Sequence, residues 1–172
     1  FTSIEGGYPR FVTPDGNWVY YQSGLTQLYR RVMTDGSGEM AVPNIDGFAH
    51  AISPDGRLLA YFFRDPSDNG KLKIGIRNLS DAALVQVLSH EETNSGPGNI
   101  AWSSDGSIIY FVSVSNRKYA LWRTSLDQAR PTFVGDLGTE NLLRFAISPD
   151  GRSILTIRGD WRHDAILIKG LH

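Results

Sequence analysis

The stretch Ser148-Pro149-Asp150-Gly151 occurs in nearly the same form at three other places in this chain of 172 residues. The four copies begin at positions 13, 53, 103 and 148, which gives a repeat of about 45 residues. The earlier copies are Thr13-Pro14-Asp15-Gly16, Ser53-Pro54-Asp55-Gly56 and Ser103-Ser104-Asp105-Gly106. Self-similarity at this period indicates a repeat architecture, so the fold is best interpreted one repeat at a time.

Each copy has the composition of a tight turn. Proline fixes its φ at about −65°, glycine accepts a left-handed conformation, and the hydroxyl and carboxylate oxygens accept nearby backbone N–H groups. On this interpretation Ser104, which replaces proline in the third copy, costs only part of the preorganisation of its turn. We therefore assign a structural role in the turns, and no catalytic or metal-binding role, to Asp15, Asp55, Asp105 and Asp150.

Short runs rich in β-branched and aromatic residues flank every turn, and they predict an all-β fold. The strands expected are residues 1–4, 8–12, 17–23, 27–33, 39–42, 48–52, 58–63, 72–77, 84–88, 98–102, 108–114, 119–124, 132–134, 143–147, 153–158 and 165–169. The runs at 18–21, 58–61 and 108–111 are apolar at every position, whereas a sheet with one face in water would alternate. We therefore expect small sheets that are covered on both faces, as in sheets stacked around an axis.

These features predict a β-propeller of four blades, each nominally of four strands, over residues 1–172. The blade units are expected at about 5–42, 43–88, 89–134 and 135–169. Because the last unit has only three expected strands, we predict that Phe1 to Ile4 completes it and so removes an unpaired sheet edge. Three arrangements remain open: a closed four-bladed ring, a fragment of a larger propeller, and half of a dimeric eight-bladed ring.

The stretch from Phe48 to Phe62 resembles the TolB-type (WD-like) β-propeller repeat, and residues 100–106 and 145–152 match the same pattern. The ending, residues 158–169, resembles the last blade of bacterial propellers that form the C-terminal part of longer proteins. Such propellers usually have six or more blades, whereas this chain carries four repeats. The resemblance implies that a ligand binds at the mouth of the central channel or on loops at one face.

Composition narrows the classes of function. A formal net charge of −1 argues against a nucleic-acid binder, which needs a basic surface to neutralise phosphates. The longest apolar run is Leu58 to Phe63, so we expect no membrane insertion. The sequence contains no cysteine, and we expect neither a metal nor a cofactor. It shows no signal-peptide pattern, which leaves a periplasmic or a cytoplasmic location open.

Polar side chains in or near the innermost strands are the candidates for a binding site at the channel mouth: Arg10, His50, Asn99 and Arg144. Ordinary solvation of strand ends is the alternative for these four. A second group lies between two expected strands and is equally compatible with an exposed hairpin: Asp160, Trp161, Arg162, His163 and Asp164. The segment from Asp65 to Gly70 lacks the carboxylate pattern of a calcium loop, and we expect a turn there.

No sequence motif of a serine hydrolase, zinc protease or phosphate-binding loop occurs. The leading hypothesis is therefore a non-catalytic interaction or ligand-sensing module that binds a protein, a peptide or a small ligand. The alternative is a propeller enzyme, hydrolase-like in character, in which His50, His163 and nearby acids meet on one face. A scaffold that contacts the rest of a longer protein and a homodimer that completes a propeller are further possibilities.

Overall fold

The computed structural model describes residues 7–23, 28–33, 35–42, 47–89, 99–128 and 130–159. Apart from one short 3-10 helix, η2 (Pro66–Asp68), the regular elements in these ranges are all strands. The strands expected at 1–4 and 165–169 lie outside the described residues, and so does the predicted closing role of Phe1 to Ile4.

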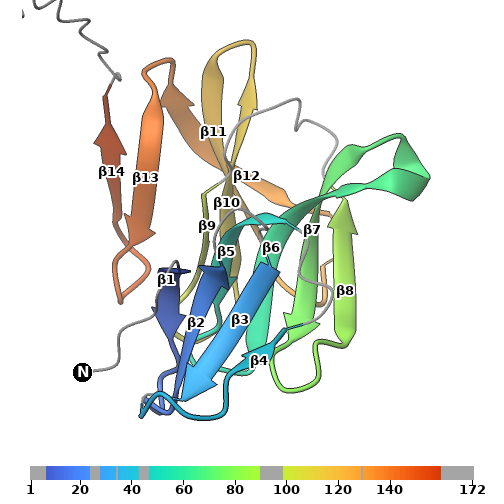
Figure 1. Cartoon of the computed structure of the whole chain (residues 1–172). Coiled ribbons are helices and arrows are strands. Elements are labelled where there is room, and N and C mark those ends of the chain that lie inside the picture. The colour runs from blue at the N-terminus through green and yellow to red at the C-terminus, as the bar shows by residue number, and fades with distance from the viewer. Residues whose placement is uncertain are drawn as a thin grey trace, which may run out of the picture.

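The described strands form four antiparallel sheets (Figure 1). The first contains β1 (Gly7–Val12), β2 (Trp18–Ser23), β3 (Leu28–Met33) and β4 (Met40–Ala41). The second contains β5 (Phe48–Ile52), β6 (Leu58–Asp65), β7 (Lys71–Asn78) and β8 (Leu84–Ser89). The third contains β9 (Ile100–Trp102), β10 (Ile109–Ser115), β11 (Lys118–Thr124) and β12 (Thr132–Gly138), and the described part of the fourth contains β13 (Leu142–Ile147) and β14 (Ile154–Arg158).

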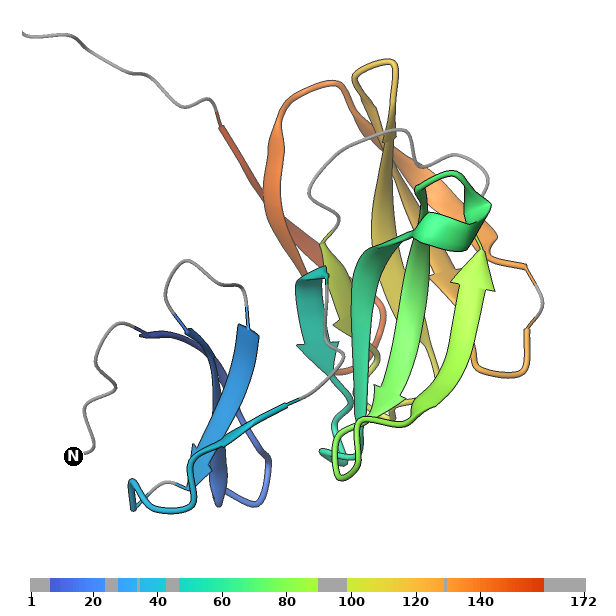
Figure 2. The ribbon, with the colours of Figure 1, turned by 45° about the vertical axis from the view of Figure 1, so that its right-hand side comes forward.

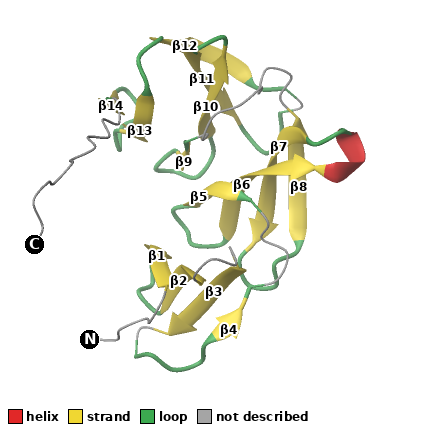
Figure 3. Cartoon of the chain, turned by 45° about the horizontal axis from the view of Figure 1, so that its top comes forward, coloured by secondary structure: helices red, strands yellow, loops and turns green. Residues whose placement is uncertain are grey.

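Strand order within each sheet follows the order of the chain. The first strand of each sheet, namely β1, β5, β9 or β13, lies on the inner side of an arc, and β4, β8 and β12 lie on its outer side (Figure 3). We call these first strands the inner strands. We call the face of a sheet that is turned towards the next sheet in the chain its forward face, and the opposite one its backward face. The first and the last sheet stand at the two ends of the arc (Figures 2 and 3).

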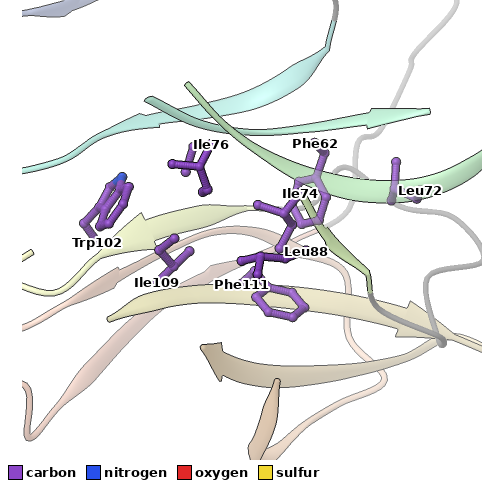
Figure 4. Close-up of a cluster of buried hydrophobic side chains, with 9 residues drawn as sticks. Phe62, Leu72, Ile74, Ile76, Leu88, Trp102, Ile109 and Phe111 are labelled. Atoms are coloured by element: carbon purple, nitrogen blue, oxygen red, sulfur yellow. The ribbon is translucent and has the colours of Figure 1, made fainter. Parts of the chain in front are cut away.

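Side chains alternate between the two faces of a strand. In the second sheet, a cluster of apolar side chains buries each of these faces. In β6, Leu59 and Tyr61 lie on the backward face and pack in one cluster with Tyr20 of β2. Ala60 and Phe62 lie on the forward face. They belong to a cluster between the second and third sheets (Figure 4) that comprises Ala60, Phe62, Leu72, Ile74, Ile76, Leu88, Trp102, Ile109 and Phe111. Each large side chain buried in this way stabilises the fold by about 1.5–3 kcal/mol.

The same alternation continues into the third and fourth sheets. Tyr110 and Val112 point forward from β10 and pack with Leu121 and with Leu142 of β13. Phe145, Ile147 and Ile154 of the fourth sheet are packed against this cluster. The apolar runs after the turns thus have the two-sided burial that their composition predicted.

Several strands are longer than the sequence indicated, and β6 and β12 extend furthest beyond an expected end. The hairpin of β6 and β7 extends to the pair Asp65 and Lys71, beyond the expected end of the first strand at Phe63. Strand β12 continues to Gly138, although its expected end was Val134. The pairing of β12 with β11 contains two register shifts, which are irregularities of the β-bulge kind. β12 contains glycine, which tolerates such irregular backbone.

Gly75 of β7 lies where no side chain fits. A Cβ added there would come within 2.6 Å of Cζ of the buried Tyr61. We expect Gly75→Ala to lower the free energy of unfolding by about 1–3 kcal/mol, because the ring of Tyr61 must move in a packed interface. Urea unfolding followed by tryptophan fluorescence measures the loss.

Gly135 of β12 provides the matched control. A Cβ there would meet no atom of the described residues within 4 Å, and Gly135→Ala should change the free energy of unfolding by no more than about 0.5 kcal/mol. Equal losses in the two variants would contradict steric exclusion at Gly75 and would point to a general effect of replacing glycine in these strands.

Candidate functional site

The four repeated turns are closed by one common set of hydrogen bonds. In the second copy, the hydroxyl of Ser53 donates to Oδ1 of Asp55 at 2.6 Å, and the N–H of Arg57 donates to the same oxygen at 3.1 Å. The N–H of Leu58 donates to Oγ of Ser53 at 2.9 Å. The other three copies repeat all three contacts. Every repeated aspartate is therefore engaged within its own turn.

These hydrogen bonds lower the pKa of the four turn carboxyls. At Asp105 the hydroxyl of Ser103, followed by the N–H and the hydroxyl of Ser107, lowers the pKa to about 2. Donors favour the ionised form of a carboxyl, so each group is a carboxylate at neutral pH. A group that stays ionised near neutrality is a poor general acid, and the arrangement is better suited to holding the turn than to moving protons.

The turns also contact one another from sheet to sheet. A Cβ built on Gly56 would lie 2.8 Å from Cδ of Pro14 in the preceding turn, and a Cβ on Gly106 would lie 3.5 Å from Cδ of Pro54. In the third turn, Ser104 donates a hydrogen bond of 2.5 Å to the carbonyl of Pro149 in the fourth turn. The four turns thus form a continuous row along one end of the sheets, and we call it the turn row.

Two side chains near the start and the end of the inner strand β9 join neighbouring sheets. Nδ2 of Asn99 donates to the carbonyl of Leu143 in β13 at 3.1 Å, and Nε1 of Trp102 donates to the carbonyl of Ala51 in β5 at 3.1 Å. The first bond links the third sheet to the fourth, and the second links the third sheet to the second. Asn99 was a candidate for ligand binding, and the structure places its amide on a neighbouring strand.

His50 lies on the backward side of β5, against the first-to-second sheet junction. Its ring stacks on Tyr61, with ring centres 5.9 Å apart and an interplanar angle of 7°, and its Nε2 is shielded from solvent. Nε of Arg77 donates a hydrogen bond of 2.6 Å to the hydroxyl of Tyr61, and Nη1 of Arg77 donates to the carbonyl of Ala82 at 2.7 Å. Sequence reasoning did not anticipate this stack, since its members come from three strands of one sheet.

The structure describes only one side chain among the remaining candidate residues, that of Arg144. Arg144 of β13 is exposed and lies opposite Ile157 of β14. The side chain of Arg10 lies outside the described part of the chain, as do Trp161, Arg162 and His163. The structure therefore brings none of the described candidates together into one cluster, and the hypothesis that these residues bind a ligand stays a prediction.

The loop from Asp65 to Gly70 is a hairpin tip that is held by ion pairs. Nζ of Lys73 lies 2.7 Å from Oδ2 of Asp65 and 3.0 Å from Oδ2 of Asp68. Its ammonium group lowers the pKa of Asp65, together with donors from Ser67, to about 2. The ammonium group of Lys73 thus lies between the carboxylates of Asp65 and Asp68, where a bound cation would lie. Within the described ranges, no three acidic or histidine side chains lie close enough together to hold a metal ion.

Sequence reasoning predicted a strand at residues 84–88, which the structure has as β8, but did not single it out as a candidate binding surface. Its side chains Leu84, Val85 and Val87 are exposed, although they are apolar. The signal was available in the sequence, because the run Leu-Val-Gln-Val-Leu-Ser carries no charged residue and no proline. Among the residues that the structure describes, no helix is long and apolar enough to cross a membrane.

No family model matches the chain. An uncharacterised WD repeat-containing protein of Synechocystis is 28% identical, over 84% of this chain and 39% of that protein. TolB from Acinetobacter baumannii superposes with a TM-score of 0.67 at 18% identity, over 86% of this chain and 36% of TolB. A chain of the nidogen–laminin complex superposes with a TM-score of 0.60 at 11% identity, over 83% of this chain and 52% of that one.

The fold is that of a TolB-type β-propeller. This propeller spans about two fifths of the Synechocystis protein and of TolB, as the coverage of 39% and 36% states. The number of blades in a complete ring therefore stays a prediction. A propeller fold hosts many functions, so any specific site must come from the side chains that this chain adds to the fold.

The lowered pKa values of the turn carboxyls give the propeller a specific pH dependence. A carboxyl whose pKa is lower in the folded state contributes stability above its unfolded pKa, and this contribution is lost as the pH falls through the folded value. For Asp105 this window lies between its ordinary value of 3.8 and about 2. We expect urea midpoints to fall across this window, and to fall less steeply in Asp105→Asn, which keeps an acceptor oxygen but no titration. Identical slopes in both proteins would contradict the assignment.

Proposed function

We propose that this propeller is a non-catalytic interaction module that takes an extended segment of a partner protein along the outer edge of the second sheet. The observation that carries the proposal is the character of β8. It is the last strand of its sheet, it pairs with β7 on one side, and no described strand pairs with its other side.

The exposed apolar area on β8 is concentrated. The exposed fractions are 50% for Leu84, 51% for Val85 and 38% for Val87. Native sheets usually protect an edge strand with lysine, proline or an inward-pointing charge. β8 has none of these, and exposed contiguous apolar surface on a folded protein marks an interaction site.

An extended peptide matches this surface chemically. A free strand edge offers alternating N–H and C=O groups, so a partner strand gains main-chain hydrogen bonds of the same kind that join β7 and β8. Apolar side chains at every second position of the partner would pack on the valines and the leucine, and this pairing would supply specificity. The partner expected is therefore a protein segment with alternating apolar residues and few charges.

Two further observations support a binding role. The repeated carboxylates are engaged in their own turns, and His50 is stacked on Tyr61 with Nε2 shielded from solvent, so these groups serve the scaffold. One chain of a solved nidogen–laminin complex superposes on this propeller with a TM-score of 0.60, so a related fold occurs in a protein–protein complex. The enzyme alternative needs His163, which lies outside the described residues, and no described contact favours it.

A double variant tests the proposal. Val85→Lys with Val87→Lys places two charges on the edge strand and should weaken binding of an extended peptide at least about tenfold, which corresponds to about 1.4 kcal/mol. The probe is a peptide selected from a random library against the unmodified chain. Fluorescence anisotropy measures its affinity, and amide hydrogen exchange should show new protection in β8 when it binds.

Val134→Lys is the matched control, because Val134 is an exposed valine on β12, the outer strand of the next sheet. It should leave the affinity for the selected peptide unchanged. Peptides that protect amides of the inner strands and ignore the double variant would refute the proposal and would favour the channel mouth. Melting temperatures of all variants confirm that folding is intact.

A further inference from the structure

We infer that the segment bound at β8 places one residue opposite Val87, in an antiparallel pair that exchanges two main-chain hydrogen bonds, and that the residue before it packs on Phe133 of the third sheet. The inference rests on the proposed function, because it specifies how the edge of β8 recognises its partner. We call the two peptide positions the pairing residue and the preceding residue. Phe133 is then the side chain that discriminates between partners.

Main-chain groups along β7 point alternately to its two neighbouring strands. The N–H of Asn78 donates to the carbonyl of Ala83 at 2.9 Å, on the β8 side. The N–H of Leu79 donates to the carbonyl of Arg57 at 2.8 Å, on the β6 side. Opposite residues of an antiparallel ladder alternate in this way between bonded and non-bonded pairs. The pairing of β7 with β6 has no register shift, so the alternation continues and Gly75 turns its groups towards β6.

Val87 consequently presents its main-chain groups at the outer edge of β8. It lies opposite Gly75, and a residue opposite one that bonds to β6 makes no ladder bond to β7. Its neighbours Gln86 and Leu88 bond to β7 instead. Val87 is therefore the position at which an added antiparallel strand gains two main-chain hydrogen bonds.

A register shift limits the length of this pairing. Between Gln86 and Leu84 the partners on β7 advance by one residue only, so Val85 is an extra residue in β8. Such a residue disrupts the ladder locally and breaks the regular spacing of the outward groups. A regular partner strand therefore pairs with β8 from Gln86 to its end at Ser89. An antiparallel pair suits so short a stretch, because one residue supplies both hydrogen bonds.

Two rows of apolar side chains face each other across the junction of the second and third sheets. The first row runs outward through opposite residues of β6, β7 and β8, which are Phe62, Ile74 and Leu88. The second row runs outward through opposite residues of β10, β11 and β12, which are Phe111, Trp122 and Phe133. The rings of Phe62 and Phe111 meet with their centres 6.1 Å apart (Figure 4). The outermost members, Leu88 and Phe133, therefore correspond across the junction.

Phe133 is the least covered member of the two rows. Its exposed fraction is 53%, whereas that of Leu88 is 4%. Its ring meets the ring of Trp122 nearly edge-on, with centres 5.4 Å apart and an interplanar angle of 73°. The indole N–H of Trp122 donates to Oγ of the buried Ser113 at 2.9 Å, which holds the indole in place. Val134 is an extra residue at a register shift, lies outside the row and so keeps its use as a control. An exposed aromatic ring held by its neighbours is typical of the anchor in a binding site.

A strand added to β8 extends the first row by one position. The preceding residue would lie opposite Leu88 in a pair that is not hydrogen-bonded, where side chains of two strands come closest. Its side chain would share the forward face with Leu88 and cover Phe133, whereas the pairing residue would share the opposite face with Val87. The partner expected is an extended peptide that carries two adjacent apolar residues, one for each face.

The amide of Val87 gives the first test. The probe is the selected peptide bound to the unmodified 172-residue chain, with hydrogen exchange followed residue by residue by NMR. The Val87 amide should exchange at least about tenfold more slowly in the complex, whereas the amides of Gln86 and Leu88 are already protected by β7. Protection elsewhere in β8 without any change at Val87 would overturn the inference.

N-methylation of the peptide, one residue at a time, tests the same pairing from the partner's side. A methyl group removes the donor, so binding should weaken at least about tenfold at the pairing residue. Because outward and inward groups alternate along a strand, the losses should recur at every second peptide residue and spare the residues between. Equal losses at adjacent residues would contradict a strand pair.

A double-mutant cycle tests Phe133. Phe133→Ala and alanine at the preceding residue should each weaken binding about tenfold, and the two together little more than either alone, because both remove one contact. Alanine at the pairing residue should instead add to the effect of Phe133→Ala. Phe133→Leu keeps apolar surface and should lose less than Phe133→Ala. Leu155→Ala, at an exposed leucine of β14, is the control and should leave the affinity unchanged.

Failure of this inference differs from failure of the proposed function. If the peptide protects β8 but binds Phe133→Ala as tightly as the unmodified chain, only the inference is overturned. The same holds if Phe133 couples to the pairing residue and not to the preceding one. If the variant with Val85→Lys and Val87→Lys binds the peptide unchanged, the proposed function fails as well.

Discussion

The structure depends on sheets that bury both of their faces. A four-stranded sheet of this size is marginal alone, and here each internal sheet gains stability only when a neighbour covers it on either side. Leu59 and Phe62 point to opposite faces of β6, and both are almost completely buried. The protein therefore behaves as a one-dimensional stack in which stability comes from junctions between repeats.

Polar groups in this stack serve mainly to set geometry. The turn carboxylates hold the turn that follows each inner strand. Hydrogen bonds from Asn99 and Trp102 fix the position of one inner strand relative to its neighbours. The ring of His50 fills space beside Tyr61, while Arg77 satisfies the hydroxyl of that tyrosine. Among the described residues, each of these polar groups is hydrogen-bonded to or stacked on a different part of the scaffold.

The sequence predicted the architecture well because turns and apolar runs are local signals. The four Ser/Thr-x-Asp-Gly copies placed the turns to the residue, and the runs such as Leu58 to Tyr61 predicted two-sided burial. The contacts of candidate side chains were less accessible, because they depend on which strand lies opposite. Nothing in the sequence near Asn99 indicates that its partner is the carbonyl of Leu143, 44 residues away. The exposure of Leu84 and Val85 was also not predicted, although their run carries no charge and no proline, because an apolar run indicates a strand but not how much of each side chain is covered.

At Ser104 the turn row is joined by a hydrogen bond, and the two earlier junctions involve a proline and a glycine. At the two earlier junctions a proline ring lies beside the glycine of the next turn, and a Cβ on that glycine would come within 2.8 Å of Pro14 or 3.5 Å of Pro54. At the third junction the contact is an exposed hydroxyl that donates to the carbonyl of Pro149, and water can replace it at a net cost of about 1 kcal/mol. The third and fourth sheets are therefore joined by directional hydrogen bonds, from Ser104 in the turn row and from Asn99 beside the inner strands, whereas the earlier turns meet through a proline.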